Sequence, residues 1–381
     1  MHSSTRSSST ISGTSSVGCS VTVNLENARW TSRTPRCIGL LSKSTEIGDV
    51  DDELNTYYAD LGRSAFDAPM FDDVIDNFRG SALPIAAVRF RLPANVVLGA
   101  AATSQRSYRG GLIFHVGRCG STLLCNLLAS VRGWVALKEP EFVNALLLRL
   151  AAERNPNSKD RLAALVALLL RSLWHGVRFD TDGCERASVV KLSSWNAILA
   201  DEFVWRLDSI PLVVVTRDPW ATVASFLHDP PHWYSPPPTP SADRSSAPAN
   251  RMEAARFFAE AWSRTVEGAL RLPARRTLFV NYGELVDDPL SVLVRVCRHL
   301  GNGRESPNIE SVGKITGQYS KAAREERFEP RDRYHRDALE AEVKDLVTTI
   351  TASSWSALVK RTPPAAMPIA ASDPKLTFRK K

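Results

Sequence analysis

The chain has 381 residues, of which 44% are hydrophobic and 23% are charged, and its formal net charge at pH 7 is +7. This balance is typical of a soluble globular protein with one large domain. The positive charge suits an anionic ligand, but the body of the chain has no Lys/Arg-rich runs, which argues against a nucleic-acid partner. The longest apolar run, residues 162–170, is too short to span a bilayer.

The six cysteines contain no C-x-x-C pair, and neither the cysteines nor the histidines are spaced like zinc ligands. No secretory signal with an apolar core is evident. We therefore expect reduced thiols, a cytoplasmic protein and no bound metal.

Residues 1–45 contain twelve serines and a single acidic residue, Glu26. This composition cannot build a core and predicts a disordered Ser-rich tail; a transit segment or an overlong start are the alternatives. Residues 46–105 are expected to form an N-terminal subdomain, with helix-like spacing over residues 51–78 and a short strand over residues 86–92.

Residues 106–360 alternate between short apolar runs and longer helical patterns. Strands are predicted over residues 112–116, 189–192, 212–216 and 277–280. Helices are predicted over residues 121–130, 141–152, 160–174, 196–207, 219–228, 251–270, 289–300 and 335–360. Such alternation implies βαβ units. The sequence therefore predicts an α/β, P-loop-like, three-layer fold with a central, mostly parallel sheet flanked by helices.

Two further segments are rich in proline. Residues 229–250 contain seven prolines and predict an insertion that borders the mouth of an active site. His228 and His232 flank this insertion and are minor candidates for lining the acceptor entrance. Residues 361–381 are Pro/Ala-rich and then basic, and they predict a flexible tail.

An anion-binding loop is predicted over Gly117-Arg118-Cys119-Gly120-Ser121-Thr122, which follows a strand and opens a helix. Backbone N–H groups in such a turn, together with the helix dipole, bind anions. Gly120 allows the backbone to come close to the anion, and two hydroxyls follow it. A nucleoside-triphosphate loop has Lys after its last glycine, whereas here Ser121 follows and the cation is Arg118. The sequence therefore predicts that the loop binds an anion, but the loop lacks the lysine of loops that bind ATP with magnesium.

The loop residues Arg118 to Thr122 resemble the R-S-G-T-T phosphosulfate loop of the P-loop sulfotransferase superfamily. A second motif of that family is a strand that ends in Arg, then Asn or Asp, then Pro, with a Ser eight positions after the Arg. Arg217 and Ser225 keep this spacing here.

A third segment, residues 279–289, resembles the family's Y-E-x-L…D-P segment, with Gly283 inserted after Tyr282. The three motifs occur in order within residues 111–330, and their style is closest to tyrosylprotein, carbohydrate-type and bacterial sulfotransferases. In such relatives the equivalents of Arg217 and Ser225 bind the 3'-phosphate of the cosubstrate.

The resemblance implies transfer of a sulfuryl group from 3'-phosphoadenosine 5'-phosphosulfate to an acceptor hydroxyl, with release of 3',5'-bisphosphoadenosine and no metal. The acceptor class stays open among small molecules, carbohydrates, lipids and peptides. The alternatives are an ATP-dependent P-loop phosphotransferase and a non-catalytic nucleotide-binding module. The resemblance also implies that Tyr282 lies near the adenosine and that Ser320 and Lys321 lie in a late loop over the cosubstrate.

Three residues are candidates for catalysis. Arg118 would stabilise charge on the leaving phosphate. Glu139 resembles the glutamate base of tyrosylprotein sulfotransferases in its offset from the loop arginine, with Glu141 as the alternative base. Lys191 closes an apolar strand, so it is expected to face the ligand crevice, where relatives have a lysine on the sulfuryl group. His115 is expected to lie near the loop without acting as a base.

Overall fold

The computed structural model describes residues 109–176, 186–207, 210–231, 247–301, 309–316 and 339–362, together with five short strands nearer the N-terminus. These strands are β1 (Thr10–Thr14), β2 (Ser20–Asn24), β3 (Cys37–Leu41), β4 (Asn55–Asp60) and β5 (Phe90–Pro93). Strand β1 pairs with β2, and β3, β4 and β5 form a second antiparallel sheet.

The proposed tails, the N-terminal subdomain and the proline-rich insertion fall mostly outside the described residues, as do His232, Ser320 and Lys321. Strand β4 lies within residues 51–78, where the spacing predicted a helix. Its aromatic pair, Tyr57 and Tyr58, favours a pleated strand.

Five parallel strands form the central sheet, in the order β10-β9-β6-β8-β7. They are β6 (Gly110–His115), β7 (Trp134–Lys138), β8 (Ala187–Lys191), β9 (Leu212–Thr216) and β10 (Thr277–Asn281). The four strands other than β10 are buried along their whole length. A parallel sheet covered on both faces requires such continuous apolar runs, so the predicted fold class is confirmed.

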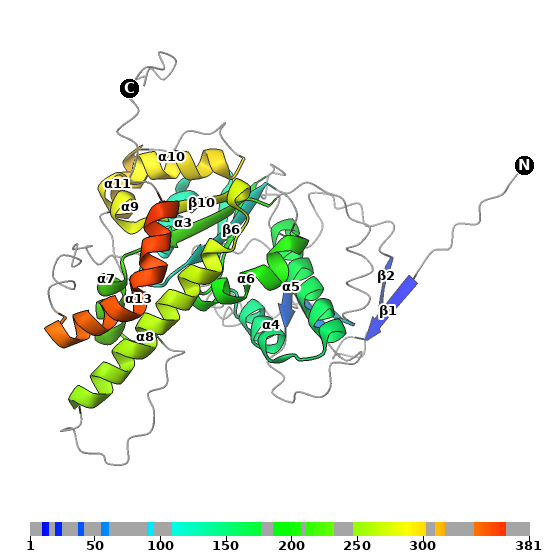
Figure 1. Ribbon diagram of the computed structural model, residues 1–381. Coiled ribbons are helices and arrows are strands. Elements are labelled where there is room, and N and C mark those ends of the chain that lie inside the picture. The colour runs from blue at the N-terminus through cyan, green and yellow to red at the C-terminus, as the bar shows by residue number, and fades with distance from the viewer. Residues whose placement is uncertain are drawn as a thin grey trace, which may run out of the picture.

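Helices cover both faces of the sheet (Figure 1). One face carries α4 (Glu141–Ala152), α5 (Pro156–Gly176) and the short turns η1 (Ser194–Leu199), α6 (Ala200–Phe203) and η2 (Val204–Arg206). The other carries α3 (Ser121–Ser130), α9 (Tyr282–Asp287), α10 (Pro289–His299) and α11 (Ile309–Thr316). Along β6, Leu112 and Phe114 pack into the first core and Ile113 into the second, as strand alternation requires.

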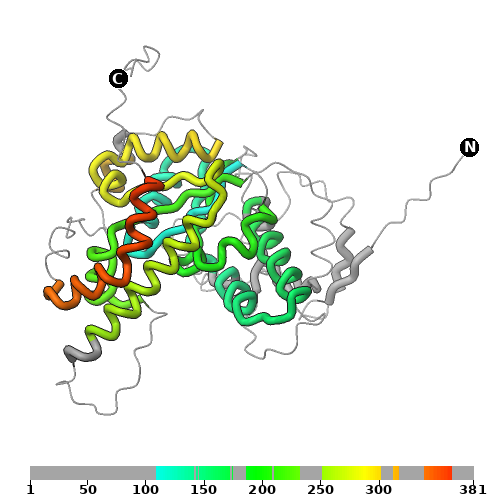
Figure 2. The backbone as a smooth tube through the Cα atoms, viewed as in Figure 1, coloured from blue at the N-terminus to red at the C-terminus, as the bar shows by residue number. Residues whose placement is uncertain are grey.

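A third apolar cluster joins α7 (Pro219–His228), α8 (Ala247–Leu270) and α13 (Ala341–Arg361). Helices α8 and α13 run side by side, and Figure 2 shows both as long continuous segments. Among the described helices, none combines the length and the hydropathy needed to cross a membrane.

The stretch predicted as helical over residues 196–207 is helical as far as Arg206, in three consecutive short segments, η1, α6 and η2. Ser193 and Asn196 form a reciprocal capping box, in which the Ser193 N–H donates to Asn196 Oδ1 over 2.7 Å. A capping box satisfies backbone groups where a helical segment begins, so it fixes the start of η1 at Ser194.

Gly268 on α8 marks the closest packing against η1. A Cβ at this position would lie 2.0 Å from the Ala197 carbonyl oxygen. We expect Gly268→Ala to lower the free energy of unfolding by about 1–3 kcal/mol, because overpacking outweighs the gain in helix propensity. Urea unfolding measures this effect. Gly313→Ala on α11 is the control, because no atom of the described residues, apart from its chain neighbours and its own helix backbone, would lie within 4 Å of the added Cβ. Equal stability of the two variants would contradict this packing.

Candidate active site

The predicted site residues lie at one edge of the sheet, where its parallel strands end. Strand β6 leads into the anion loop, β7 into Glu139 and β8 ends at Lys191. Arg217 follows β9, and Tyr282 follows β10. Ligands of open α/β sheets bind outside the carboxyl ends of the strands, so this edge is the candidate active site.

The anion loop turns through three residues with positive φ: Gly117 (+82°), Arg118 (+48°) and Gly120 (+76°). A Cβ on Gly117 would lie 2.5 Å from the Phe226 ring. Gly120 caps α3, so the first N–H groups of that helix face the turn. Such a backbone is the kind that binds anions, and anion binding by this loop stays a prediction. The remaining loop side chains are all buried: Cys119, Ser121 and Thr122.

Arg217 and Tyr282 join the other two motifs to this loop. Arg217 Nη1 donates to the Arg118 carbonyl oxygen over 2.6 Å, and its guanidinium lies 4.7 Å from the centre of the Tyr282 ring. A Cβ on Gly120 would lie 2.9 Å from the same ring. The three sequence motifs therefore meet at one place. Ser225 lies half-buried in the second turn of α7, the helix that begins just after Arg217.

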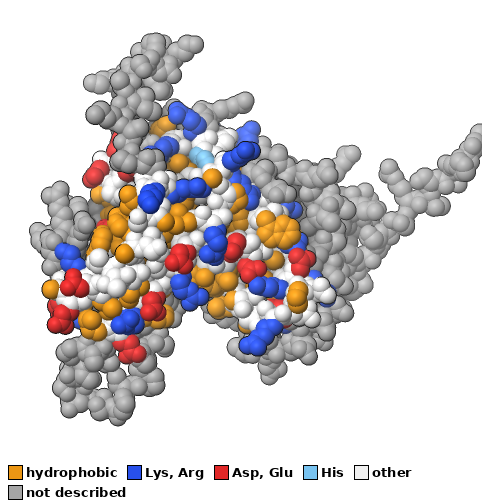
Figure 3. Space-filling model, in the orientation of Figure 1, with side chains coloured by type: hydrophobic (Ala, Val, Ile, Leu, Met, Phe, Trp, Pro, Cys, Tyr) orange, Lys and Arg blue, Asp and Glu red, His pale blue; other side chains and the backbone are white. Residues whose placement is uncertain are grey.

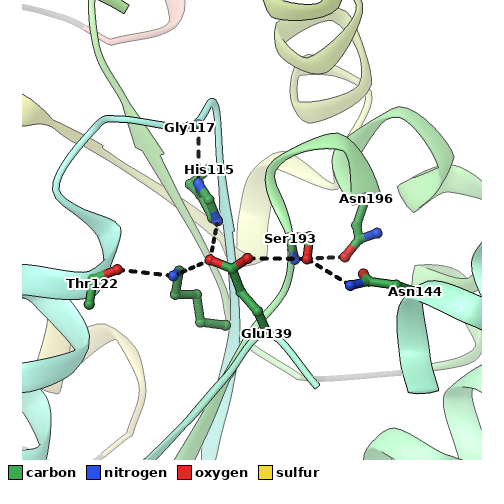
Figure 4. A network of polar contacts seen from close by, with 8 residues as sticks. His115, Gly117, Thr122, Glu139, Asn144, Ser193 and Asn196 are labelled. Carbon is green, nitrogen blue, oxygen red and sulfur yellow. Dashed lines mark hydrogen bonds and ion pairs between the residues drawn. The ribbon is translucent and has the colours of Figure 1, made fainter. Parts of the chain in front are cut away.

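Glu139 is the centre of a buried polar network (Figure 4). Lys191 Nζ donates to Glu139 Oε1 and also, over 3.1 Å, to Thr122 Oγ1. Ser193 Oγ donates to Glu139 Oε2 over 3.2 Å, and it accepts a hydrogen bond of 2.9 Å from Asn144 Nδ2. The lysine therefore connects the carboxylate directly to the anion loop.

The charges of this network hold Glu139 ionised. Burial raises the pKa of its carboxyl, but the Lys191 ammonium and His115 outweigh burial, so the net pKa lies well below its usual range. Lys191 is completely buried, whereas the Glu139 side chain is 14% exposed. The Glu139 backbone is also constrained, with φ at +52° and its N–H donating to the Lys191 carbonyl oxygen over 2.7 Å.

His115 and Cys119 form a second coupled pair beside the loop. Burial lowers the pKa of His115, but hydrogen bonding with Cys119 and Glu139 outweighs it, so the pKa is raised. Burial raises the pKa of the Cys119 thiol, but His115 reverses the shift, so that pKa is lowered. On α3, burial raises the pKa of Cys125 to about 11, against the opposing effect of the Lys191 and Lys138 charges.

The Arg118 side chain extends toward the C-terminus of α7. Its Nη2 donates to the Asp229 carboxylate over 2.6 Å and to the Asp229 carbonyl oxygen. Asp229 is exposed, and its N–H caps the helix through the Ser225 carbonyl oxygen. The guanidinium is therefore paired with protein groups in this structure.

Sequence reasoning missed Ser193, Asn144 and Asp229. Ser193 follows Lys191 by two residues, so its place after a strand end was a usable signal. The positions of Asn144 and Asp229 depend on how α4 and α7 pack, which local patterns do not specify. Glu141, the alternative base, is the first residue of α4, and the choice of Glu139 over it stays a prediction.

Among the described residues, no group of three or more His, Cys, Asp or Glu side chains could hold a metal ion. Figure 3 shows Lys and Arg side chains spread over the face in view, with Asp and Glu among them.

No family model matches the sequence, and no curated protein matches it. Solved structures that are similar to this chain include three sulfotransferases. The sulfotransferase domain of the Synechococcus PCC 7002 olefin synthase is 17% identical, with a TM-score of 0.39, over 65% of this chain and 97% of that domain. The sulfotransferase domain of the curacin biosynthetic pathway is 17% identical, with a TM-score of 0.38, over 66% of this chain and 99% of that domain. Sulfotransferase STF9 of Mycobacterium avium is 13% identical, with a TM-score of 0.38, over 71% of this chain and 79% of that protein.

The Lys191–Glu139 pair generates a stability prediction. Lys191→Met leaves a buried carboxylate without its partner, and we expect a loss of about 3–5 kcal/mol in the free energy of unfolding at pH 7. Adding Glu139→Gln should recover most of this loss, because the amide is neutral. The loss should also shrink as the pH falls through the carboxyl range, where Glu139 becomes protonated in the variant.

The measurement is urea unfolding of the two single variants and the double variant. Arg271→Met is the control, because its ion pair with Asp201 is half exposed and should contribute less than about 1 kcal/mol. Strictly additive losses from the two substitutions would show that the pair is not coupled.

Proposed function

We propose that this chain transfers a sulfuryl group from 3'-phosphoadenosine 5'-phosphosulfate to an acceptor hydroxyl. The single observation that carries the proposal is the position of Lys191 Nζ, which contacts both Thr122 in the anion loop and Glu139. A fixed cation between an anion site and a carboxylate is what transfer of an anionic group to a hydroxyl requires.

The residues fit each part of the cosubstrate. Backbone N–H groups of the anion loop, with Ser121 and Thr122, would bind the 5'-phosphosulfate. Arg217 and Ser225 would bind the 3'-phosphate, since a planar guanidinium grips phosphate well. Tyr282 would lie against the adenosine, and Ser320 and Lys321 are proposed to cover it.

In the proposed reaction, the acceptor oxygen bonds to sulfur while the bond from sulfur to the bridging oxygen breaks. The acceptor proton passes to Glu139, and the electron pair of the broken bond stays on the 5'-phosphate of 3',5'-bisphosphoadenosine. Charge therefore grows on the leaving oxygen, where Lys191 and Arg118 are proposed to stabilise it. A phosphate that recruits Arg118 would compete with Asp229 for the guanidinium.

The ion pair also explains how Glu139 can act as a base despite its low pKa. Lys191 holds the carboxylate in its ionised form. Once the ammonium shares its charge with a sulfuryl group, its hold on Glu139 weakens and the pKa of Glu139 rises toward a value suited to accepting a proton. Oε2 is the better acceptor, because it receives only the Ser193 hydrogen bond, whereas Oε1 binds Lys191 and faces His115.

The acceptor is a hydroxyl compound whose class stays open among small molecules, carbohydrates, lipids and peptides. A cytoplasmic location is part of the same proposal.

Ligand binding tests the cosubstrate. 3',5'-Bisphosphoadenosine at 100 times its dissociation constant should add about 2.7 kcal/mol to stability and raise the thermal midpoint by a few degrees. Arg217→Ala should remove most of this shift. Arg276→Ala is the matched control, because this arginine also donates hydrogen bonds to backbone carbonyls. It precedes β10 and therefore lies where the strands begin, away from the site at their carboxyl ends. Stabilisation by ATP with magnesium instead would favour a phosphotransferase.

Turnover tests the base. Glu139→Gln should lower the rate of sulfuryl transfer by about 100- to 10,000-fold while ligand affinity stays nearly unchanged, since the amide keeps the shape but cannot accept the proton. The measurement is release of 3',5'-bisphosphoadenosine with a panel of hydroxyl acceptors. Glu202→Gln, which breaks the remote pair with Lys159, should leave the rate intact. Full activity in Glu139→Gln would refute the assignment, and binding without turnover in the wild type would favour a non-catalytic module.

A further inference from the structure

His115 lies between the two halves of the site. It is the last residue of β6, and its side chain is 6% exposed. Its Nδ1 accepts a hydrogen bond of 3.1 Å from the Gly117 N–H, and its Nε2 lies 3.6 Å from Glu139 Oε1 (Figure 4). The ring therefore hydrogen-bonds the anion loop through Nδ1, while Nε2 makes no hydrogen bond among the described residues and lies within ion-pair distance of the carboxylate.

The first contact determines the protonation of the ring. The Gly117 amide can only donate, so Nδ1 must offer a lone pair. A neutral ring then carries its hydrogen on Nε2, directed toward Glu139. A second proton would place an N–H on Nδ1, opposite the Gly117 N–H, and would break that bond. The neutral ring is therefore the form that holds the loop.

The loop needs such support. Gly117 and Arg118 are consecutive residues with positive φ, and an unpaired N–H in this buried turn would be costly. Arg217 donates a hydrogen bond to the carbonyl oxygen of Arg118, and His115 accepts one from the N–H of Gly117. The two contacts hold the turn from opposite ends.

We propose that His115 is a positioning residue that joins the anion loop to the Glu139 carboxylate, and that it does so only while its ring is neutral. Its role in turnover rests on the proposed function, whereas its role in the loop does not. The charged and titratable groups that face the ring are Cys119 from the loop, Glu139 after β7 and Lys191 at the end of β8. Cys119 and Glu139 raise the pKa of His115, so the neutral form is lost early on acidification.

Two substitutions separate the two contacts. In His115→Asn, the Oδ1 atom is as many bonds from Cβ as Nδ1 is, so the variant keeps an acceptor for Gly117 and loses the reach to Glu139. In His115→Gln, the terminal amide is as many bonds from Cβ as Nε2 is, so the variant keeps a donor for Glu139 and loses the acceptor for Gly117. Neither side chain titrates in the range where histidine does.

The first readout is hydrogen exchange of the loop amides in the protein without ligand. Exchange at Gly117 should be faster in His115→Gln and unchanged in His115→Asn. Binding of 3',5'-bisphosphoadenosine should weaken about tenfold in His115→Gln, as expected for one unsatisfied buried N–H, and should stay within about threefold of the wild type in His115→Asn. Equal behaviour of the two variants in both measurements would overturn the proposal.

The second readout is the pH profile of turnover. In the wild type, protonation of His115 should set the acid limb, and in His115→Asn this limb should move to lower pH. A purely structural role would lower the rate without moving the limb, so an unchanged limb would overturn the coupling to the ring's charge. If the wild type neither binds 3',5'-bisphosphoadenosine nor turns over, the proposed function fails, and hydrogen exchange at Gly117 still decides the role of His115.

Discussion

The candidate site depends on one buried ion pair, between Lys191 and Glu139. A completely buried ammonium is tolerated only with a partner, and here the carboxylate and the Thr122 hydroxyl provide it. The pair and its bond to Thr122 hold three segments at fixed positions: the end of β8, the residue after β7 and the first turn of α3. The same charge that stabilises this arrangement is available to an anionic ligand, so folding and the proposed chemistry use one interaction.

Strand order brings these groups together. Strand β8 lies between β6 and β7, so Lys191 has the anion loop on one side and Glu139 on the other. Arg217 reaches the loop from β9, the neighbour of β6 on its other side. With Tyr282 after β10, the site is therefore assembled from all five strands of the sheet, and each contributes its residue where the strand ends or just after it.

Much of this architecture could be predicted from local patterns. Buried parallel strands are continuous apolar runs, and the anion loop is a contiguous segment, so both were recognisable in the sequence. The helical stretch over residues 196–207 was recognisable too, but its division into 3-10 and α segments was not, because it depends on close packing against α8 at Gly268. Local patterns do not specify the hydrogen bonds of Glu139, because its partners Lys191 and Ser193 lie 52 and 54 residues from it along the chain. His115 was placed near the loop, but its tautomer depends on the direction of the Gly117 N–H.

The two charged residues with positive φ, Arg118 and Glu139, have a consequence for how this chain tolerates change. Side chains with a Cβ are disfavoured in that conformation, whereas glycine and asparagine accept it. At Arg118, selection for folding stability alone would favour such a replacement and remove a guanidinium from the site. At Glu139 it would not, because the buried Lys191 ammonium would lose its partner. At Arg118, therefore, stability and the proposed chemistry oppose each other, and a stabilised variant of this protein is expected to lose the loop guanidinium before its core changes.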